Sequence, residues 1–425
     1  MIVLFTLVNL AAIAFVARWE WKRLAPSDTR IFWSALLLRL AGGLAIGLLY
    51  KFYYDTTGDT FVFFNDASKL AELCYRHPSE YIKFIVTGNT PIDIVTTEPR
   101  SVFFVAIVSV VNLATYNNYW VSSLWFSFFA FWCSYKLVIK LDEIFPASKA
   151  ASRIALLFVP SVVFWGSGII KESVALSAIA IMVIHFLSLM RSKRLTWINF
   201  LALGIYTYLL LNLKYYWGAV LIPSLVTSLL VYWMFAKTTR SAWAITAIWM
   251  LVFAILSVIV SFTHPNFYME RFLTVIVENH DTFVKISDPG DFIRFNNLSA
   301  DWGSILINGP WALVSGLFRP MIFEASSMVG AAAAVENLFF LGLVVWKLKS
   351  LLPVGAHSRV LMTGNRLIAV AAVVYVVVLC IFLALSTPNF GTLSRYRIGF
   401  LPFFILLILN DHPILRIASK WKIQS

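Results

Sequence analysis

WAITAIWMLVFAILSVIVSF, residues 243–262, contains no charged side chain. A helix needs about 20 such residues to cross the roughly 30 Å hydrocarbon core of a bilayer. The same character continues outward from this stretch, because 60% of the 425 residues are hydrophobic and only 13% are charged. The mean hydropathy of +0.81 lies outside the range of soluble domains. The chain is therefore predicted to be an all-α, polytopic integral membrane protein.

About eleven apolar stretches are candidate membrane spans. They lie near residues 1–17, 32–50, 118–136, 151–168, 172–190, 198–213, 216–235, 243–262, 328–346, 366–386 and 397–410. With these spans, residues 1–425 form a single transmembrane domain that leaves two large outer loops, 51–100 and 263–327. The apolar stretch 101–116 is expected to be re-entrant or juxtamembrane on the outer side, because a crossing there would reverse the orientation of the next basic link.

Basic residues cluster in alternate links between these spans. The links after the first, third, fifth, seventh, ninth and last spans hold 20 of the 34 Lys and Arg residues. Those residues are Arg18, Lys22, Arg23, Arg30, Lys136, Lys140, Lys149, Arg153, Arg191, Lys193, Arg194, Lys237, Arg240, Lys347, Lys349, Arg359, Arg366, Arg416, Lys420 and Lys422. The positive-inside rule makes these links cytoplasmic, with the N-terminus outside and the C-terminus inside. Small, separated basic groups also argue against a nucleic-acid partner, which needs a contiguous basic surface.

The two outer loops differ in character. The loop 51–100 is acidic, and its apolar positions Phe63, Ala67, Leu70 and Cys74 recur at helical spacing. A helix over 61–76 is therefore expected to lie on the membrane. The loop 263–327 mixes apolar pieces with Asp, Glu, Asn, Pro and Gly, which favours short helices packed on the outer surface. We expect this second loop to be a lid or an acceptor platform.

Ionisable residues gather at the predicted outer ends of several spans. They are Asp55, Asp59, Asp66, Lys171, Glu172, Lys214, Arg319, Glu324, Arg395 and Arg397. Placing a charged side chain in or near the membrane costs free energy, so each of these residues is a candidate functional residue. Arginine and lysine can hold a phosphate leaving group while a carboxylate takes the proton from an attacking hydroxyl. Hydrolysis and glycosyl transfer both fit this set.

Each of these residues also has a purely structural interpretation. Lys171–Glu172 and Arg319–Glu324 can be ordinary ion pairs, and outer arginines can reach lipid headgroups. Asp59 can be the N-cap of the 61–76 helix. Arg39 and Glu336, both in mid-span, can pair with each other. We interpret the set as functional because so many charges lie on one side of the membrane.

Three motifs resemble the GT-C superfamily of polytopic glycosyltransferases, which use polyprenyl-phosphate-linked sugars on the outer face of the membrane. GDTFVFFNDASKL, residues 58–70, looks like the acidic first outer loop in which that family places its catalytic carboxylate. FVPSVVFWGSGIIKESVALSAIAI, residues 158–181, looks like the family's P-x-x-x-x-x-S/R…D/E pattern across a second outer loop. SRYRIGFLPFFILLIL, residues 394–409, is similar to the R-Y-R-x-x-x-x-P-x-x-x-L-L start of a late helix.

The resemblance implies an inverting glycosyltransferase of the cytoplasmic membrane, with its active site on the outer face. The implied catalytic residues are Asp59 as general base, Asp66 as runner-up, and Glu172; the implied substrate-binding residues are Lys171, Lys214, Arg319, Glu324, Arg395 and Arg397. Among them, Lys214 and the two late arginines would hold the lipid phosphate, while Lys171 and Glu172 orient the sugar or the acceptor. No metal is required, although three Asp residues in one loop allow a divalent ion.

The implied partners are a polyprenyl-phosphate-linked sugar donor, a lipid or glycan acceptor, and membrane lipids. Three other classes stay open. An envelope polysaccharide polymerase or ligase shares the substrate class but relies chiefly on arginines and does not need the acidic first loop. A lipid-linked glycan transporter or flippase lines a path at mid-membrane with charged residues and broken helices. A non-catalytic scaffold tolerates alanine at every outer charged position.

Overall fold

The computed structural model describes residues 1–54, 58–192, 196–235, 241–262, 265–351 and 363–415. All regular secondary structure in these ranges is helical, apart from one isolated bridge between Phe292 and Asn389. Within the same ranges, eight helices are long and apolar enough to cross a membrane, and a bent pair of shorter helices makes up to nine. The prediction of an all-helical, polytopic membrane protein is thus confirmed.

Most of the membrane spans predicted from the sequence coincide with long apolar helices of the structure. They lie in α1 (Ile2–Trp21), α2 (Thr29–Phe52), α6 (Tyr119–Ile144), α9 (Lys171–Ser192), α10 (Trp197–Phe235), α11 (Ala242–Ser261), α14 (Met328–Leu351) and α15 (Thr363–Ser386). The bent pair joins Phe390–Gly399, which includes α16 (Phe390–Tyr396), to α17 (Leu401–Leu409) at an angle of 67°. The predicted total of about eleven crossings stays a prediction.

Two places depart from the predicted spans. The stretch 151–168 is broken into α7 (Lys149–Arg153), a π-helical segment (Ile154–Phe158) and α8 (Pro160–Trp165), each too short to cross. Pro160 has no backbone N–H with which to continue the preceding helix, so a new helix starts there. The stretches 198–213 and 216–235 form the single run α10, which leaves helical geometry at Lys214.

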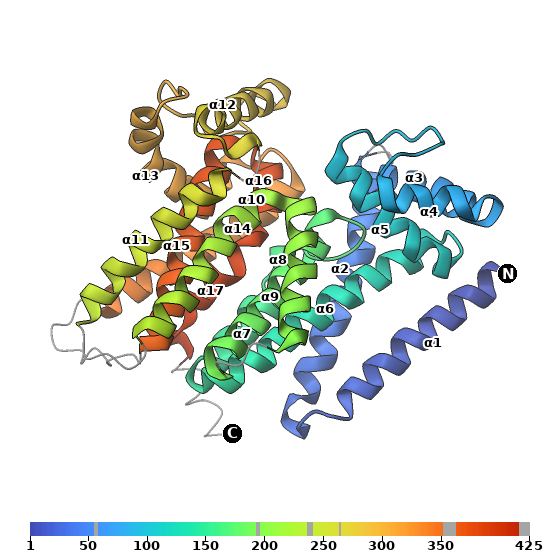
Figure 1. Cartoon of the computed structure of the whole chain (residues 1–425), viewed down its shortest axis with the longest axis horizontal. Coiled ribbons are helices and arrows are strands. Elements are labelled where there is room, and N and C mark those ends of the chain that lie inside the picture. The colour runs from blue at the N-terminus through green and yellow to red at the C-terminus, as the bar shows by residue number, and fades with distance from the viewer. Residues whose placement is uncertain (55–57, 193–195, 236–240, 263–264, 352–362, 416–425) are drawn as a thin grey trace. The chain divides into compact units, whose positions relative to one another are not determined.

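The chain folds into two compact units. Unit 1 comprises Met1–Ile139, Leu156–Val183 and Ala202–Tyr215; unit 2 comprises Lys140–Ala155, Ile184–Leu201 and Tyr216–Ser425. Helices α6, α9 and α10 contribute residues to both units. Figure 1 shows the helices coloured in chain order, from blue at the N-terminus to red at the C-terminus.

Small residues hold α2 closely within unit 1. A Cβ on Gly43 would lie 2.0 Å from Oγ of Ser127 on α6, and one on Gly47 would lie 2.7 Å from the ring of Tyr119. Such glycines let transmembrane helices approach, because van der Waals packing takes over where lipid removes the hydrophobic drive for association. The glycines therefore fix α2 against α6.

A buried arginine of α2 compensates for the break at Pro160. Arg39 is 1% exposed and donates to the carbonyl oxygens of Leu156 and Val162, at 3.2 and 2.9 Å, on the two sides of the break. Pro160 has no N–H to donate to the Leu156 carbonyl, and leaving a buried carbonyl without a partner costs about 1–3 kcal/mol. The Val162 carbonyl also accepts the N–H of Gly166 at 3.1 Å, so the arginine adds a second bond there. Gly166 leaves room for the guanidinium, because a Cβ there would lie 2.4 Å from Nη1. Arg39 is thus a structural residue of unit 1.

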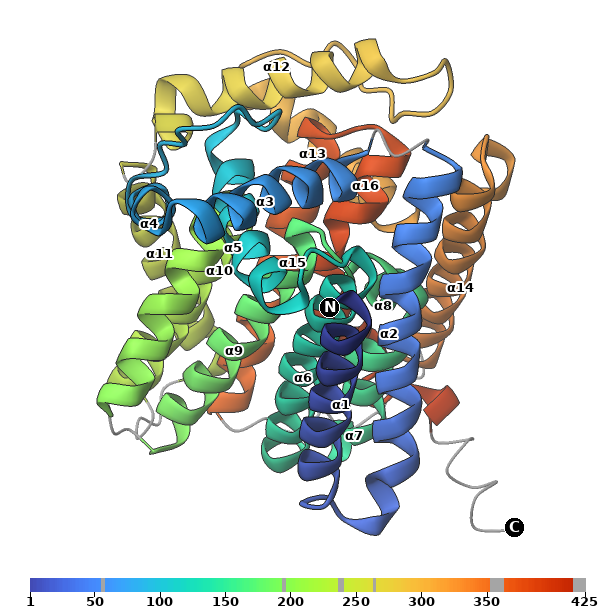
Figure 2. The same ribbon diagram turned by 90° about the vertical axis from the view of Figure 1, so that its right-hand side faces the viewer.

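The acidic loop contains the predicted helix, α3 (Asp59–Arg76), followed by α4 (Pro78–Thr87) and α5 (Pro99–Thr115). Figure 2 shows α3 running crosswise to α2, to one side of it. Phe63, Ala67 and Leu70 are buried, and the Phe63 ring packs 5.3 Å from that of Phe104 on α5. The helix is confirmed, and the expectation that it lies on the membrane stays a prediction. Helix α5, which contains most of the stretch 101–116, covers the apolar face of α3.

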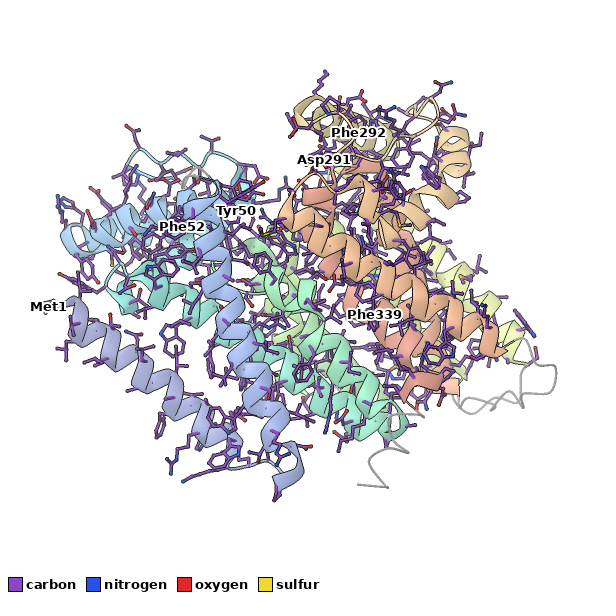
Figure 3. All side chains as sticks on the ribbon, turned by 180° about the vertical axis from the view of Figure 1, so that it is seen from behind. Met1, Tyr50, Phe52, Asp291, Phe292 and Phe339 are labelled. Carbon is purple, nitrogen blue, oxygen red and sulfur yellow. The ribbon has the colours of Figure 1, made fainter. Side chains whose placement is uncertain are left out.

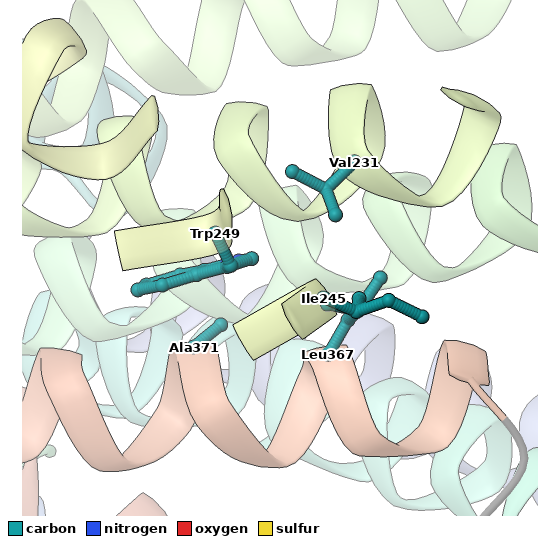
Figure 4. Packing of buried hydrophobic residues seen from close by; sticks show 5 residues of the cluster. All are labelled: Val231, Ile245, Trp249, Leu367 and Ala371. Carbon is teal, nitrogen blue, oxygen red and sulfur yellow. The ribbon is translucent and has the colours of Figure 1, made fainter. Parts of the chain in front are cut away.

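Helix α15 is the centre of unit 2, where it packs with α11, α12 (Met269–Ile286), α13 (Trp302–Phe318) and α17. A Cβ on Gly316 of α13 would lie 2.6 Å from Sγ of Cys380 on α15, so this crossing needs a glycine. Val231, Ile245, Trp249, Leu367 and Ala371 form a buried cluster that joins α10 and α11 to α15 (Figure 4). Helices α12 and α13 confirm helical structure in the loop 263–327, and α12 lies across the ends of α11 and α15 (Figure 1).

Candidate functional site

Asp59 is the first residue of α3, and the residues around it fix the start of that helix. Gly58 has N-cap geometry, and a Cβ there would lie 2.0 Å from the Tyr50 ring, so the position requires glycine. The buried Thr60 hydroxyl lies 2.9 Å from the hydroxyl of Tyr119, whose ring stacks on Phe61 at 4.3 Å. Because Gly58 takes the capping position, Asp59 is not the N-cap. Its side chain is exposed at a well-anchored helix start.

Asp66 lies two turns further along the same helix, on nearly the same side as Asp59, and is 1% exposed. Its two carboxylate oxygens accept hydrogen bonds from the backbone N–H groups of Val95 and Thr96, at 3.1 and 2.9 Å. Lys69 contributes a longer contact at 3.9 Å. These bonds hold the connection between α4 and α5 against α3. Asp66 therefore has a structural task and little access to a substrate.

Lys171 begins α9 and reaches the start of α5. Its Nζ donates to Oγ of Ser101 at 2.7 Å, lies 3.4 Å from a carboxylate oxygen of Glu98, and stands 5.3 Å from the centre of the Phe63 ring. Gly168 forms the turn before α9 with φ of +70°, a conformation that glycine adopts readily, and its N–H donates to Ser127. The predicted ion pair between Lys171 and Glu172 is wrong, because consecutive helical side chains point apart and Lys171 bonds Glu98.

Glu98 contacts two cations, Lys171 and Arg100. It accepts hydrogen bonds from Oγ of Ser101, at 2.6 Å, and from the guanidinium of Arg100. Burial alone would raise the pKa of Glu98, but the Ser101 hydrogen bond and the charges of Lys171 and Arg100 outweigh it, so the pKa lies below the ordinary 4.5. Arg100 also stands 4.9 Å from the centre of the Tyr215 ring. Glu98 is thus ionised at neutral pH and neutralises one of its two cationic neighbours.

Glu172 and Lys214 form a buried ion pair in unit 1. Lys214 Nζ lies 2.7 Å from Oε1 of Glu172, and the two side chains are 4% and 0% exposed. Lys214 sits where α10 leaves helical geometry, with φ of −144° and ψ of 66°. A pair this deep is separated from bulk solvent, so neither member is placed to hold a phosphate directly at the surface.

In unit 2, Arg397 is fully buried next to the bend between α16 and α17. Its Nη1 donates to Oδ1 of Asn337 at 2.6 Å, and its Nη2 lies 3.5 Å from a carboxylate oxygen of Glu336. Glu336 thus has an ion pair within unit 2, and Arg39 bonds carbonyl groups within unit 1; the pairing of these two residues stays a prediction. Arg395 is 8% exposed, with its guanidinium 5.9 Å from the centre of the Tyr396 ring.

Arg319 and Glu324 form a partly exposed ion pair after α13, as the structural interpretation predicted. Arg319 Nε lies 3.0 Å from Oε2 of Glu324, whose carboxylate also accepts the backbone N–H of Met321 at 2.8 Å. The arginine stands 5.4 Å from the ring centre of Trp311 and 5.1 Å from that of Phe390. This pair lines a pocket of about 580 Å³.

The predicted site residues divide between the two units. Unit 1 holds Asp59, Asp66, Lys171, Glu172 and Lys214, and unit 2 holds Arg319, Glu324, Arg395 and Arg397. The hypothesis of a single site that joins both groups stays a prediction, and Asp55 lies outside the described residues. Within unit 1, sequence reasoning missed Glu98 and Arg100, although a proline at 99 that opens an apolar run is a helix-start signal.

Among the residues described, no three His, Cys, Asp or Glu side chains gather as a metal site. Comparisons of the chain with protein-family models, with curated proteins and with solved structures give no match.

Proposed function

We propose that the chain is a membrane glycosyltransferase that moves a sugar from a polyprenyl-phosphate donor to a lipid or glycan acceptor at the outer face of the cytoplasmic membrane. One observation carries the proposal. Asp59 and Phe63 lie four residues apart on α3, so their Cβ atoms share a face about 5–6 Å apart. Lys171 stands over the Phe63 ring. The exposed carboxylate thus shares a face of α3 with the ring that a cation contacts.

The chemistry needs these two charges in different roles. Asp59 takes the proton from the acceptor hydroxyl while that oxygen forms a bond to the anomeric carbon. The bond from this carbon to the phosphate oxygen breaks, the phosphate leaves with the electron pair, and the carbon is inverted. Lys171 and the half-exposed Arg100 stabilise the charge on the departing phosphate. This scheme needs no metal-dependent step.

The positions of the other candidates narrow the proposal. Asp66 and Glu172 are buried and engaged, so we assign proton transfer to Asp59 and positioning roles to these two. Asp66 fixes the connection in front of α5, and Glu172 holds Lys214 at the break in α10. The basic links of the sequence orient the amino terminus and Asp59 outward.

The test is Asp59→Asn in the purified, reconstituted chain. Removal of a general base typically lowers the rate 10²–10⁴-fold, so we expect that loss in transfer from a polyprenyl-phosphate sugar, with donor binding retained. The matched control is Glu72→Gln, which neutralises another exposed carboxylate on the same helix. Near-normal turnover of Asp59→Asn removes Asp59 as the base and favours a polymerase or ligase that depends on arginines.

A second candidate, a transporter of lipid-linked glycans, is supported by a different observation. Buried charge pairs occur at two interrupted helices: Glu172–Lys214 at the break in α10, and Glu336–Arg397 at the bend before α17. Discontinuous helices with buried charges are typical of transport sites. Movement of a fluorescent lipid-linked sugar across proteoliposomes, unchanged by Asp59→Asn and without any transfer product, would favour this candidate.

A further inference from the structure

Unit 2 contains a pocket whose residues have no role in the proposed proton transfer or phosphate stabilisation. It lies between the chain that follows α12, the middle of α13, and the residues after α13. Its charged and aromatic lining includes Asp291, Arg294, Trp311, Arg319, Phe323 and Glu324. Figure 3 labels Asp291 and Phe292 side by side in this region. At about 580 Å³, the pocket has the size of a small-molecule site.

The backbone that forms this pocket is fixed by hydrogen bonds. The carbonyl oxygen of Asp291 accepts the N–H of Phe390 at 3.0 Å, and the N–H of Ile293 donates to Pro388 at 3.0 Å. The indole N–H of Trp311 donates to the carbonyl of Arg294 at 3.1 Å. The segment 291–294 is therefore held to α13 and to the start of α16, so the pocket is formed before a ligand arrives.

The charges of the pocket balance. Two carboxylates, of Asp291 and Glu324, line the pocket together with two guanidinium groups, of Arg294 and Arg319. Burial alone would raise the pKa of Glu324, but the bonds from Arg319 and from the Met321 N–H outweigh it, so Glu324 is ionised. A phosphate would meet two negative groups as well as two positive ones. The balance disfavours a multiply charged anion and suits a neutral ligand with many hydroxyl groups.

The aromatic residues of the pocket indicate which kind of ligand fits it. Phe323 is 88% exposed, and Trp311 is 47% exposed with its N–H already bonded to the protein. Exposed rings beside charged hydrogen-bonding groups match a molecule with apolar C–H faces and hydroxyl edges. We infer that this pocket binds a neutral saccharide unit. Its identity as the acceptor glycan rests on the proposed function; its binding does not.

The experiment is saturation-transfer NMR on the full chain in nanodiscs. The probes are a panel of neutral oligosaccharides built from hexoses and N-acetylhexosamines, with inorganic pyrophosphate as the anionic probe. We expect at least one neutral oligosaccharide to bind and pyrophosphate not to displace it. Asp291→Asn should weaken this binding about tenfold, because a charged hydrogen-bond acceptor is replaced by a weaker, neutral one.

A second variant protects the test against misfolding. Phe323 is largely exposed, so Phe323→Ala should leave the fold intact and weaken binding about three- to tenfold. Phe339 on α14, 57% exposed and away from Asp291 in Figure 3, gives the matched control Phe339→Ala, which should bind as the wild type does. Absence of binding across the panel, binding that ignores both pocket variants, or displacement by pyrophosphate would overturn the inference.

The same assay separates this inference from the proposed function. Asp59→Asn should bind the saccharide normally, because Asp59 is not among the residues that line the pocket. A chain that binds the saccharide through Asp291 and transfers no sugar refutes the glycosyltransferase proposal and leaves the pocket assignment standing. A chain that transfers the sugar but binds no neutral saccharide refutes the pocket assignment and leaves the glycosyltransferase proposal standing.

Discussion

In unit 1 the charged side chains lie mostly against one another, whereas in unit 2 four of them line an open pocket. Glu172 and Lys214 are almost fully buried as a pair, and Asp66 is covered by the chain it holds. In the pocket of unit 2, Arg319 and Glu324 pair as well, but beside exposed aromatic rings and a second, unlike pair of charges. The two regions contain similar types of charged residue, but solvent and ligands reach those of the unit 2 pocket more easily than the buried charges of unit 1.

This difference separates charges that maintain structure from charges that meet ligands. Taking an ion out of water costs several kcal/mol even after the protein relaxes, and a good partner is needed to offset that cost. A buried pair is therefore sensitive to the loss of either member. A charge at an open pocket keeps its hydration until a ligand arrives, so its removal changes binding more than stability.

The largest effect on stability is expected at the buried pair. Glu172→Gln leaves Lys214 buried with a neutral partner, and breaking a buried pair costs about 3–5 kcal/mol. The control is Glu143→Gln, which breaks the pair with Lys140; Glu143 is 61% exposed, and such surface pairs contribute about 0–1 kcal/mol. Thermal unfolding of the purified chain in detergent compares the two variants. Glu172→Met combined with Lys214→Met should recover much of the loss.

Equal unfolding temperatures for Glu172→Gln and Glu143→Gln would contradict the comparison. That result would mean that water reaches the Glu172 carboxylate and that the break at Lys214 opens to solvent.

The fold was largely predictable because long apolar runs encode membrane helices directly. The helix over 61–76 was also correct, since Phe63, Ala67 and Leu70 share one face. The sequence could not show which partner covers that face, because lipid and the apolar helix α5 present equally apolar surfaces. The break within 151–168 was missed because the residues on both sides of Pro160 are apolar enough for a continuous span.

The candidate site was predictable in its residue types but not in its pairings. Lys171 precedes Glu172, which suggested an ion pair, yet each reaches a residue far along the chain: Glu98 for the first and Lys214 for the second. Such partners depend on how α5, α9 and α10 meet, and a single sequence does not encode those contacts locally. Asp59 and Asp66 looked equivalent for the same reason, since only the fold makes one exposed and the other buried.

A smaller effect on stability is expected at Asp66. Asp66→Asn turns one hydrogen-bond acceptor into an NH₂ group that faces a backbone N–H, so we expect a loss of about 2–3 kcal/mol, as for hydrogen bonds to a charged group. The exposed Asp59→Asn, on the same helix, should change stability by no more than about 0.5 kcal/mol. Limited proteolysis across residues 89–98, together with thermal unfolding, measures both. Equal protection of this connection in the two variants would contradict the structural role of Asp66.

The smallest effect is expected at Glu98, which lies between the two extremes with 40% of its side chain exposed. Its pKa in the folded chain is lower than its ordinary 4.5, so its stabilising contribution is fully present above about pH 4.5 and is lost as the pH falls through the lowered value. Protonation removes the negative charge that faces Lys171 and Arg100. Water screens a half-exposed carboxylate, which keeps the contribution modest.

Glu98→Gln isolates this contribution, because it keeps the shape of the side chain and removes its titration. We expect the unfolding temperature of the wild type to exceed that of Glu98→Gln at pH 7, and the difference to shrink as the pH is lowered below about 4.5. Asp93→Asn, at an exposed position in the same connection, serves as the control and should retain the pH dependence of the wild type. A difference between wild type and Glu98→Gln that stays constant from pH 7 to pH 3 would mean that the ionisation of Glu98 does not contribute to stability. In that case Glu98 does not neutralise Lys171, and the positive charge of Lys171 is available to bind an anionic ligand.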